Sequence, residues 1–386
     1  MQHLRLGIIG LGNMGQVHAF SLSGGKDSRC HLAAVCDPDQ EVLRKFPDAR
    51  PFQSSSELIR SGEVDAVLVA TPHYSHAPIG IKALQAGLHL LMEKPLCAHK
   101  ADCERLIDAH RSEKQIFAIM LNQRTDPYYL TLRELIRTGE LGAIRRINWI
   151  ITNWFRTAAY YSSGRWRATW WGEGGGVLLN QCAHQLDLWQ WLFGMPRKVR
   201  AFCHIGRYHD IEVEDDVTAY LEYDDGTTGV FITSTGEAPG TNRLEVTAEK
   251  GRVVVENDHF LYTRNEIPTS KFSKESLEGF SQPSSHTIEI SLDGHGGQHA
   301  ELLQNFVDAI LEGKALMAPG AEGIHSVELA NAMLLSSFTG ETLQFPIDGK
   351  TYETFLKERI ASSKIEKKVS NPRVLSIDDF RRSFNP

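Results

Sequence analysis

Residues Leu4-Arg5-Leu6-Gly7-Ile8-Ile9-Gly10-Leu11-Gly12-Asn13-Met14-Gly15 decide the fold of the N-terminal half. The first six form a short apolar run typical of a strand, and the G-x-G-x-x-G pattern that follows opens a helix-like stretch. Gly10 permits a tight turn, Gly12 lets the backbone approach a pyrophosphate, and Gly15 lets helix and strand pack closely. Because the helix N-terminus then faces the anion, the stretch predicts a dinucleotide-binding unit.

An acidic residue supports this prediction and points to the cofactor. Asp37 follows the strand-like run Leu32–Cys36 and lies 22 residues after Gly15. At that place a carboxylate accepts hydrogen bonds from the adenosine ribose hydroxyls and repels a 2′-phosphate, which favours NAD over NADP. The alternative is a glycine turn beside an unrelated surface aspartate, and the position of both features at strand ends disfavours it.

The first 122 residues alternate short apolar runs with helix-like segments, which is typical of a doubly wound parallel sheet, the Rossmann arrangement. The predicted strands are Leu4–Ile9, Leu32–Cys36, Ala66–Ala70, Leu88–Met92 and Ile116–Leu121. Two segments between the later strands have the length and period of crossover helices, Ser75–Ala86 and Lys100–Lys114.

After residue 143 the pattern changes to β-branched and aromatic alternation, with hairpin turns at Asp224-Asp225-Gly226 and Glu249-Lys250-Gly251. The predicted strands are Ile144–Phe155, Lys198–Gly206, Val217–Tyr223, Gly229–Thr235, Arg243–Ala248 and Arg252–Glu256. Helices are predicted at Gly176–Phe193, His299–Leu311 and Glu322–Ser337, and residues 265–285 are predicted to form an exposed loop. We therefore expect an NAD-binding domain over 1–122, a substrate-binding and oligomerisation domain over 123–345, and a C-terminal helix and tail over 346–386.

Composition excludes several function classes. With 386 residues and Lys+Arg minus Asp+Glu equal to 41 − 48 = −7, the chain has no excess of positive charge for a general nucleic-acid binder. Its six cysteines contain no C-x-x-C pair, so we expect neither a disulfide scaffold nor a zinc site. A strand-like run begins within three residues of the start, and no apolar run approaches about 18 residues, so we expect a cytoplasmic protein with no membrane partner.

Three further segments have a characteristic order. They are Ala70-Thr71-Pro72-His73, Met92-Glu93-Lys94-Pro95, and the run from Gly174 to Asp187 that reads GGGVLLNQCAHQLD. Together with the glycine motif they resemble the glucose-fructose oxidoreductase, inositol dehydrogenase and rhizopine-catabolism family, written Gfo/Idh/MocA, from residue 4 to about 360. The resemblance implies an α/β Rossmann domain followed by an α+β domain with an open, mostly antiparallel sheet, NAD as cofactor, and a sugar or polyol as substrate.

The expected cofactor contacts follow from these motifs. They are Gly10, Gly12, Asn13, Met14, Gly15, Asp37, Thr71, Pro72, His76, Glu93 and Lys94.

Lys94 and His184 are the expected catalytic residues. Lys94 ends a parallel strand, where its ammonium would face the ligand crevice and partial desolvation would lower its pKa. The resemblance assigns this lysine to the developing alkoxide, and the alternative is a surface lysine paired with Glu93. His184 matches the family's catalytic histidine, although a lone histidine among leucines is more often a core residue.

Asn180 departs from the family, because many members have aspartate four residues before the histidine. If Gly176–Phe193 is helical, Asn180 and His184 share one helix face. An amide exchanges hydrogen bonds with a hydroxyl but accepts no proton, so any proton relay depends on His184, and a role for Asp187 in orienting it stays open.

All seven tryptophans lie within a 43-residue window, residues 149–191, interleaved with arginines and tyrosines. Flat aromatic surfaces with such polar neighbours suit a sugar ring, although any single tryptophan here is more often a packing residue. The expected substrate-binding residues are Asn180, Asp187, Arg167, Trp166 and Arg124. No metal is assigned to His295 and His299, since no acidic ligand completes a site.

We expect an NAD-dependent oxidoreductase that oxidises a secondary hydroxyl, or reduces the ketone, of a cyclic polyol, sugar or glycoside. A first alternative keeps the site but transiently oxidises a glycoside hydroxyl to cleave the glycosidic bond without net redox change. A second is a non-catalytic NAD-binding regulator, against which the presence of both Lys94 and His184 argues. Helices should cover only one face of the second sheet, and the resemblance implies that the open face pairs with another subunit, so we expect a homo-dimer or homo-tetramer formed through that face.

Overall fold

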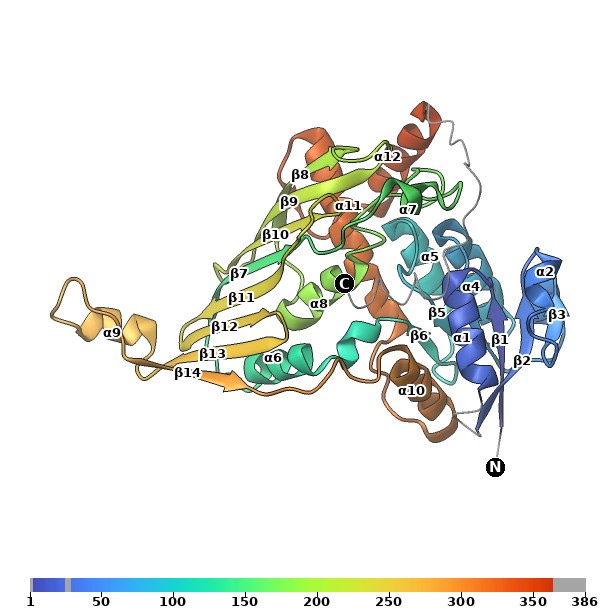
Figure 1. Cartoon of the computed structure of the whole chain (residues 1–386), viewed down its shortest axis with the longest axis horizontal. Helices are drawn as coiled ribbons and strands as arrows, with labels where there is room; N and C mark the ends of the chain where they lie inside the picture. Colours follow the sequence, from blue (N-terminus) through green and yellow to red (C-terminus); the bar gives the residue numbers. More distant parts are fainter. Residues whose placement is uncertain (1–2, 25–28, 364–386) are drawn as a thin grey trace.

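The computed structural model describes residues 3–24 and 29–363 (Figure 1). Its N-terminal unit is built on a parallel sheet of six strands among these residues, in the order β3-β2-β1-β4-β5-β6. The strands are β1 (Leu4–Ile9), β2 (Cys30–Cys36), β3 (Arg50–Phe52), β4 (Ala66–Val69), β5 (His89–Met92) and β6 (Phe117–Ile119). The order reverses between β1 and β4, and ligands of such sheets bind at that switch point, beyond the carboxyl ends of the strands.

Helices flank this sheet and bury both of its faces, which is why the strands are almost continuously apolar. These helices are α1 (Asn13–Ser23), α2 (Gln40–Leu43), α3 (Ser55–Arg60), the short η1 (His73–Ser75), α4 (His76–Gln85) and α5 (Lys100–Ala109). Leu6 and Ile8 of β1 and Leu68 of β4 have no exposed surface. The predicted Rossmann arrangement is confirmed.

The second unit is built on a larger sheet, with nine strands within the described ranges, in the order β14-β13-β12-β11-β7-β10-β9-β8-β15. The strands are β7 (Ile144–Ile151), β8 (Lys198–Ile205), β9 (Glu214–Glu222), β10 (Thr228–Ser234), β11 (Asn242–Ala248), β12 (Gly251–Glu256), β13 (His259–Asn265), β14 (Ser285–Ile290) and β15 (Leu343–Gln344). Among the described strand pairs of this second sheet, only β7 and β10 are parallel, and the others are antiparallel. The expected open, mostly antiparallel sheet is confirmed.

One face of this sheet carries helices, and Figure 1 shows α8 and α11 on the side that faces the N-terminal unit. The helical segments are η2 (Asn122–Thr125), α6 (Pro127–Arg137), α7 (Ala158–Ser162), α8 (Ala183–Phe193), α9 (Thr269–Glu275), α10 (Gln298–Glu312), η3 (Gly320–Glu322), α11 (Gly323–Thr339) and α12 (Gly349–Ser362). Along β7 the side chains of Ile147, Trp149 and Ile151 are fully buried beneath them, while those between are not.

The prediction of one helix over Gly176–Phe193 is wrong in its first part, because α8 begins only at Ala183. The buried carboxylate of Glu214 accepts hydrogen bonds from the backbone N–H groups of Gly176 (2.8 Å) and Leu178 (3.0 Å). These bonds hold the segment in turns against β9. Asn180 therefore lies in a turn and shares no helix face with His184.

The prediction of a loop over 265–285 is also incomplete, since α9 lies inside it and β14 begins at its end. Strands β3, β13, β14 and β15 were not predicted, and α5 ends at Ala109, five residues before the predicted end. The predicted C-terminal helix and tail correspond to α12 and to residues 364–386, and the latter lie outside the described residues. The domain limits at 122 and 345 stay predictions, and α12 packs against α5 of the first unit.

No described helix has both the length and the apolar character needed to cross a bilayer. All six cysteines have free thiols.

Candidate active site

The glycine turn has the shape that a dinucleotide needs. Gly10 has a φ of +92°, and a Cβ there would lie 2.7 Å from the carbonyl oxygen of Ala70. A Cβ on Gly15 would lie 1.8 Å from the carbonyl oxygen of Gly10, whereas a Cβ on Gly12 would meet nothing within 4 Å. Gly12 therefore faces the open space that a pyrophosphate would occupy, and the other two glycines allow the close packing that makes it.

The groups around this turn fit NAD. Asp37 accepts a hydrogen bond from the N–H of Leu11 at 2.8 Å, so its carboxylate is fixed at the end of β2 beside the glycine turn. Helix α1 begins after Gly12 without a side-chain cap, which leaves the N–H groups of Asn13 and Met14 for an anion. The hydroxyl of Thr71 is buried and has no hydrogen-bond partner among the described residues.

Other predicted cofactor residues have structural partners. The ring nitrogens of His76 lie 2.8 Å from the carbonyl oxygen of Thr71 and 2.9 Å from that of Pro95. The Glu93 carboxylate lies 2.7 Å from Nε2 of His18 on α1, and this histidine lowers the pKa of Glu93 to about 2 against the opposing effect of burial. We infer that His76 and Glu93 position the loops after β4 and β5, in which Pro72 and Lys94 lie.

Lys94 reaches from the end of β5 into the second unit. Its ammonium donates a 2.9 Å hydrogen bond to the carbonyl oxygen of Asn180. Loss of solvation lowers the pKa of Lys94, while Glu93 and Glu173 favour its charged form. The turn before α8 thus holds the lysine side chain across the boundary between the two units.

His184 lies in the first turn of α8 and is buried. Burial, together with the positive charge of Lys94, lowers its pKa well below 6.5, so the imidazole is neutral near neutral pH. Its Nδ1 atom has no hydrogen-bond partner among the described residues. A neutral imidazole beside an ammonium can accept a proton from a hydroxyl whose oxygen the ammonium stabilises.

Asn180 takes part in a polar cluster beside Lys94. Its side-chain N–H group donates to the buried Glu173 carboxylate at 2.5 Å and to the Tyr160 hydroxyl at 3.3 Å. Arg167 also donates to the Tyr160 hydroxyl, at 2.9 Å, and its guanidinium lies 4.6 Å from the centre of the Trp166 ring. Three residues predicted to bind substrate are thus in one place, and their roles stay predictions.

Arg124 and Asp187 lie elsewhere. Both are 1% exposed, and the Arg124 guanidinium donates to both carboxylate oxygens of Asp187, at 2.6 and 2.8 Å. Arg124 also donates to Glu322 at 2.5 Å. Because these groups are occupied by one another and line no described cavity, the geometry argues against their predicted contact with substrate. The pair ties α8 to η2 and η3, and we assign it to positioning.

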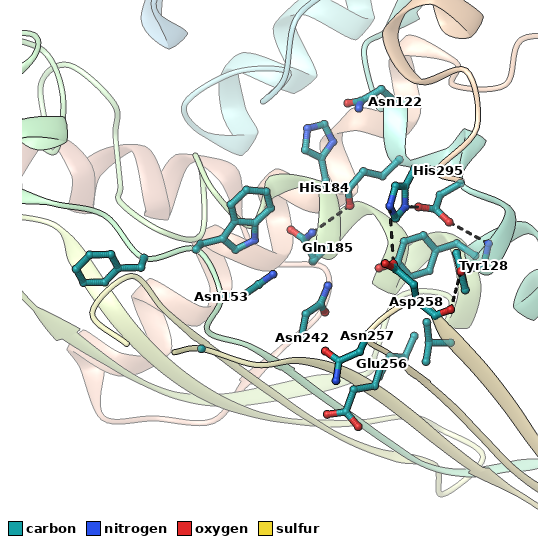
Figure 2. Close-up of a pocket in the computed structure, with 18 of the residues that line it drawn as sticks. Asn122, Tyr128, Asn153, His184, Gln185, Asn242, Glu256, Asn257, Asp258 and His295 are labelled. Atoms are coloured by element: carbon teal, nitrogen blue, oxygen red, sulfur yellow. Dashed lines mark hydrogen bonds and ion pairs between the residues drawn. The ribbon is translucent and has the colours of Figure 1, made fainter. Parts of the chain in front are cut away.

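A cavity of about 1020 Å³ opens at His184 (Figure 2). Its wall is formed by the second unit, and every described lining residue lies at or after position 122. Its polar and aromatic lining includes Asn122, Gln123, Asp126, Tyr128, Asn153, Trp154, Phe155, His184, Gln185, Glu237, Asn242, Asp258, His295, Gln298 and His299.

Most of these residues were not predicted from the sequence, although two signals point to some of them. Asn122 and Gln123 follow the end of β6, and residues beyond the carboxyl ends of parallel strands form the ligand crevice. Gln185 directly follows His184. Asn153, Glu237 and Asn242 gave no such signal, because only the pairing of β7, β10 and β11 brings them together.

His295 and His299 face different partners. Nδ1 of His295 lies 3.1 Å from Asp126, whereas the His299 ring packs edge-on against His18. No group of three or more potential metal ligands was found among the described residues.

Two family models match the chain. One, described as "Oxidoreductase family, NAD-binding Rossmann fold", matches residues 4–121, and the other, "GFO/IDH/MocA C-terminal domain", matches residues 129–254.

Individual proteins are similar to the chain over most of its length. The inositol 2-dehydrogenase of Rhizobium meliloti (strain 1021) is 24% identical over 340 residues, covering 86% of this chain and 96% of the relative. The myo-inositol 2-dehydrogenase of Thermotoga maritima is 28% identical over 266 residues, covering 66% and 75%. The WlbA dehydrogenase of Bordetella pertussis, solved in complex with NADH and UDP-GlcNAcA, has a TM-score of 0.77 at 25% identity, covering 90% of this chain and 99% of that one. The chain therefore belongs to the Gfo/Idh/MocA family of NAD-binding oxidoreductases.

Proposed function

We propose that this protein is an NAD-dependent dehydrogenase that oxidises a secondary hydroxyl of a sugar, cyclic polyol or glycoside, or reduces the corresponding ketone. The observation that carries this proposal is that Lys94, after β5 of the NAD-binding unit, bonds the turn before α8, and that the buried His184 of α8 lines a cavity of about 1020 Å³. The inositol dehydrogenases among the relatives support the substrate class.

The residues of this chain divide the work. NAD, when bound, supplies the acceptor for the hydride that leaves the carbinol carbon. His184 accepts the proton of the substrate hydroxyl, because its imidazole is neutral and solvent is largely excluded from it. Lys94 places its positive charge beside the oxygen that becomes negative, where a preorganised charge stabilises the transition state more than the ground state.

Asn180 and the Arg124–Asp187 pair keep these groups in place. Asn180 accepts the Lys94 hydrogen bond through its carbonyl oxygen, and Asp187 anchors α8 three residues after His184. A side-chain amide at position 180 accepts no proton, so the proton path ends on His184.

The test is a panel of inositols, pyranoses and glycosides incubated with NAD. We expect accumulation of NADH with at least one of them. Release of free sugar from a glycoside without net NADH would instead identify the redox-neutral cleavage. NAD binding without turnover of any compound would identify a regulator and overturn the proposal.

We propose further that the protein is a cytoplasmic homo-dimer or homo-tetramer formed through the uncovered face of the large sheet. The support is that α8 and α11 cover only the opposite face.

A further inference from the structure

The wall of the cavity is rich in amides and carboxylates. Among the described lining residues there is no lysine or arginine. Glu256 also lines the cavity, but its carboxylate forms an ion pair with the Arg243 guanidinium at 2.6 Å. Glu237, Asp126 and Asp258 remain, and Glu237 has neither a hydrogen bond nor an ion pair within the described part of the chain. A negatively charged ligand would therefore meet Glu237 with no lysine or arginine on the described wall to compensate.

Buried acceptor atoms on the same wall have no partner. Asn122 is 3% exposed and Gln185 is 2% exposed, and the side-chain oxygens of both lack a hydrogen bond among the described residues. One N–H group of each side chain is already hydrogen-bonded. Asn122 donates to Gln298 at 2.5 Å, and Gln185 donates to Gln123 at 3.0 Å. Figure 2 shows both side chains beside the same space as His184. These oxygens are closed to solvent, so a ligand reaches them only after a small shift of the side chains, and a hydroxyl or N–H donor would then satisfy them.

Three cations lie near Asn180 and Tyr160, and one of them, Arg156, also lies 5.3 Å from the centre of the ring of Trp154, which lines the cavity. Lys94 is bonded to Asn180, Arg167 is bonded to the Tyr160 hydroxyl, and the Arg156 guanidinium lies 5.1 Å from the centre of the Tyr160 ring. These three residues do not line the cavity. Within the described residues, the cavity wall thus carries carboxylates and amides but no lysine or arginine.

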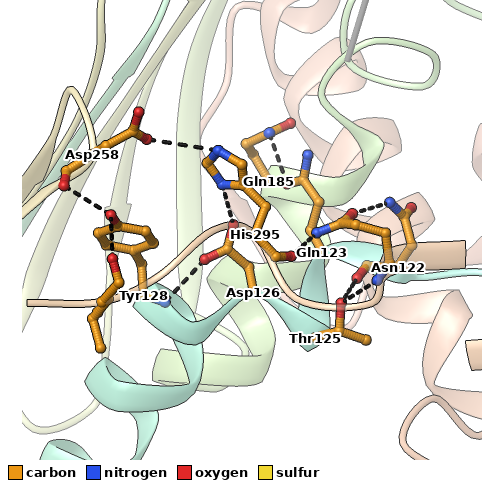
Figure 3. A network of polar contacts seen from close by, with 10 residues as sticks. Asn122, Gln123, Thr125, Asp126, Tyr128, Gln185, Asp258 and His295 are labelled. Carbon is orange, nitrogen blue, oxygen red and sulfur yellow. Dashed lines mark hydrogen bonds and ion pairs between the residues drawn. The ribbon is translucent and has the colours of Figure 1, made fainter. Parts of the chain in front are cut away.

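A second group of residues that line the cavity comes from three elements (Figure 3). His295, from the segment that joins β14 to α10, lies between Asp126, at 3.1 Å, and Asp258, at 3.8 Å. The Tyr128 hydroxyl donates to the carbonyl oxygen of Asp258 at 2.8 Å. We call these four residues the distal group: Asp126, Tyr128, Asp258 and His295. It joins α6 and the turn between β12 and β13 to the strap before α10.

The cavity has room for more than one sugar ring. Its volume of about 1020 Å³ lies at the upper end of the roughly 300–1,000 Å³ common for small-molecule sites, and no residue of the cofactor turn contributes to its wall. Trp154 and Phe155 offer aromatic surface along it, while the distal group offers a second set of polar contacts.

We propose that the substrate is a glycoside of at least two rings without an anionic group, whose second ring binds toward the distal group and is favoured when it carries an amine. This inference rests on the proposed function for the identity of the reacting ring. It excludes sugar nucleotides and uronic acids as substrates, because their charge would face Glu237 and Asp258.

The test measures binding to the enzyme–NADH complex by calorimetry, so it does not depend on turnover. The probes are glucose, UDP-glucose, and α-1,4- and β-1,4-linked disaccharides in three forms: neutral diglucoside, diglucosamine, and glucuronyl-glucose. We expect the neutral disaccharide to bind at least tenfold more tightly than glucose, and the diglucosamine at least as tightly as the neutral one. The two anionic probes should bind at least tenfold more weakly than the neutral disaccharide.

Charge-removing variants test the cause. Glu237→Gln and Asp258→Asn conserve shape, and asparagine tolerates the φ of +60° at position 258. Together they should weaken diglucosamine binding about tenfold, the effect of losing a charge-assisted hydrogen bond, and should leave the neutral disaccharide within about threefold. Glu113→Gln, the same change on an exposed loop of the N-terminal unit, is the matched control and should alter neither.

The outcomes separate this inference from the proposed function. Anionic probes that bind as tightly as the neutral disaccharide, or failure of both non-anionic disaccharides to bind, would overturn the inference even if NADH forms with a monosaccharide. Selective binding of non-anionic disaccharides without oxidation of any compound would support the inference and refute dehydrogenase activity. A variant pair that weakens every probe equally would refute the electrostatic cause.

Discussion

At the scale of single residues, the site depends on His184 being uncharged and Lys94 being charged. Both lie in surroundings that disfavour a positive charge, and the carboxylates of Glu93 and Glu173 favour the charged form of the lysine. The imidazole receives less such support, and the proposed function assigns the two groups accordingly, His184 as proton acceptor and Lys94 as fixed cation.

Substituting the two residues tests that division. His184→Ala should lower kcat by about 10²–10⁴ while NADH binding persists, since that is the usual loss for a general base. Lys94→Ala should also lower kcat, and the double variant should lose less than the product of the two effects, because both groups serve one proton transfer. A His184→Ala enzyme with near-normal turnover would remove this residue from the mechanism.

The pH profile of kcat reports the same coupling. The neutral imidazole is the active form, and its pKa is lowered well below 6.5, so kcat should stay level down to about pH 6.5 and fall only in more acidic solution. Lys94→Ala removes a positive charge that lowers the His184 pKa, so the acidic fall should move to higher pH. Lys94→Arg keeps the charge and is the control. Coinciding profiles for wild type and Lys94→Ala would contradict the coupling.

Asp37 tests the cofactor preference. Its carboxylate, fixed by the N–H of Leu11, would repel a 2′-phosphate, so kcat/KM should be higher with NAD than with NADP. Asp37→Ala should reduce the ratio of the two values. An unchanged ratio would mean that another residue selects the cofactor.

At the scale of elements, the turn before α8 places Asn180 against Lys94, and Glu214 on β9 holds that turn. In Glu214→Gln, the side-chain oxygen still accepts from one backbone N–H group. The side-chain NH2 group replaces the other oxygen, and it is a donor that cannot accept from the second backbone N–H group. We expect the free energy of unfolding to fall by about 1–3 kcal/mol, the usual cost of an unsatisfied buried group.

Denaturant unfolding measures the loss of stability. The value of kcat at saturating substrate reports whether Lys94 is still correctly positioned. Because the displaced turn carries the acceptor of Lys94, kcat should fall as well. Full kcat in a destabilised Glu214→Gln protein would show that the turn does not position the lysine.

At the scale of the whole molecule, the uncovered face of the large sheet exposes Phe202, at 55%, and Tyr220, at 43%, on adjacent strands. Leu277 and Phe280 are fully exposed between α9 and β14, in a segment that projects from the end of the sheet (Figure 1). Exposed apolar surface of this kind marks an interface between proteins.

Light scattering at micromolar concentration should therefore give two or four chains per particle. Phe202→Asp combined with Tyr220→Asp should shift the protein toward the monomer, whereas Leu277→Ser with Phe280→Ser separates the contribution of the projecting segment. A monomeric wild-type protein would contradict the expected assembly.

The sequence by itself determined the Rossmann unit and the cofactor turn, because each depends on local signals. The resemblance to a family singled out Lys94 and His184, whose catalytic roles stay predictions. Strand periodicity, glycines at fixed offsets and motifs at strand ends are all properties of short segments. The tertiary structure decided the rest. Asn180 lies in a turn and not in the predicted helix, because Glu214, 34 residues later, accepts a hydrogen bond from the backbone that precedes it. Arg124 pairs with Asp187, because a buried charge is stable only beside an opposite charge. The cavity wall of amides and carboxylates exists only where β7, β11 and the strap before α10 meet, and no local pattern encodes such contacts between distant segments.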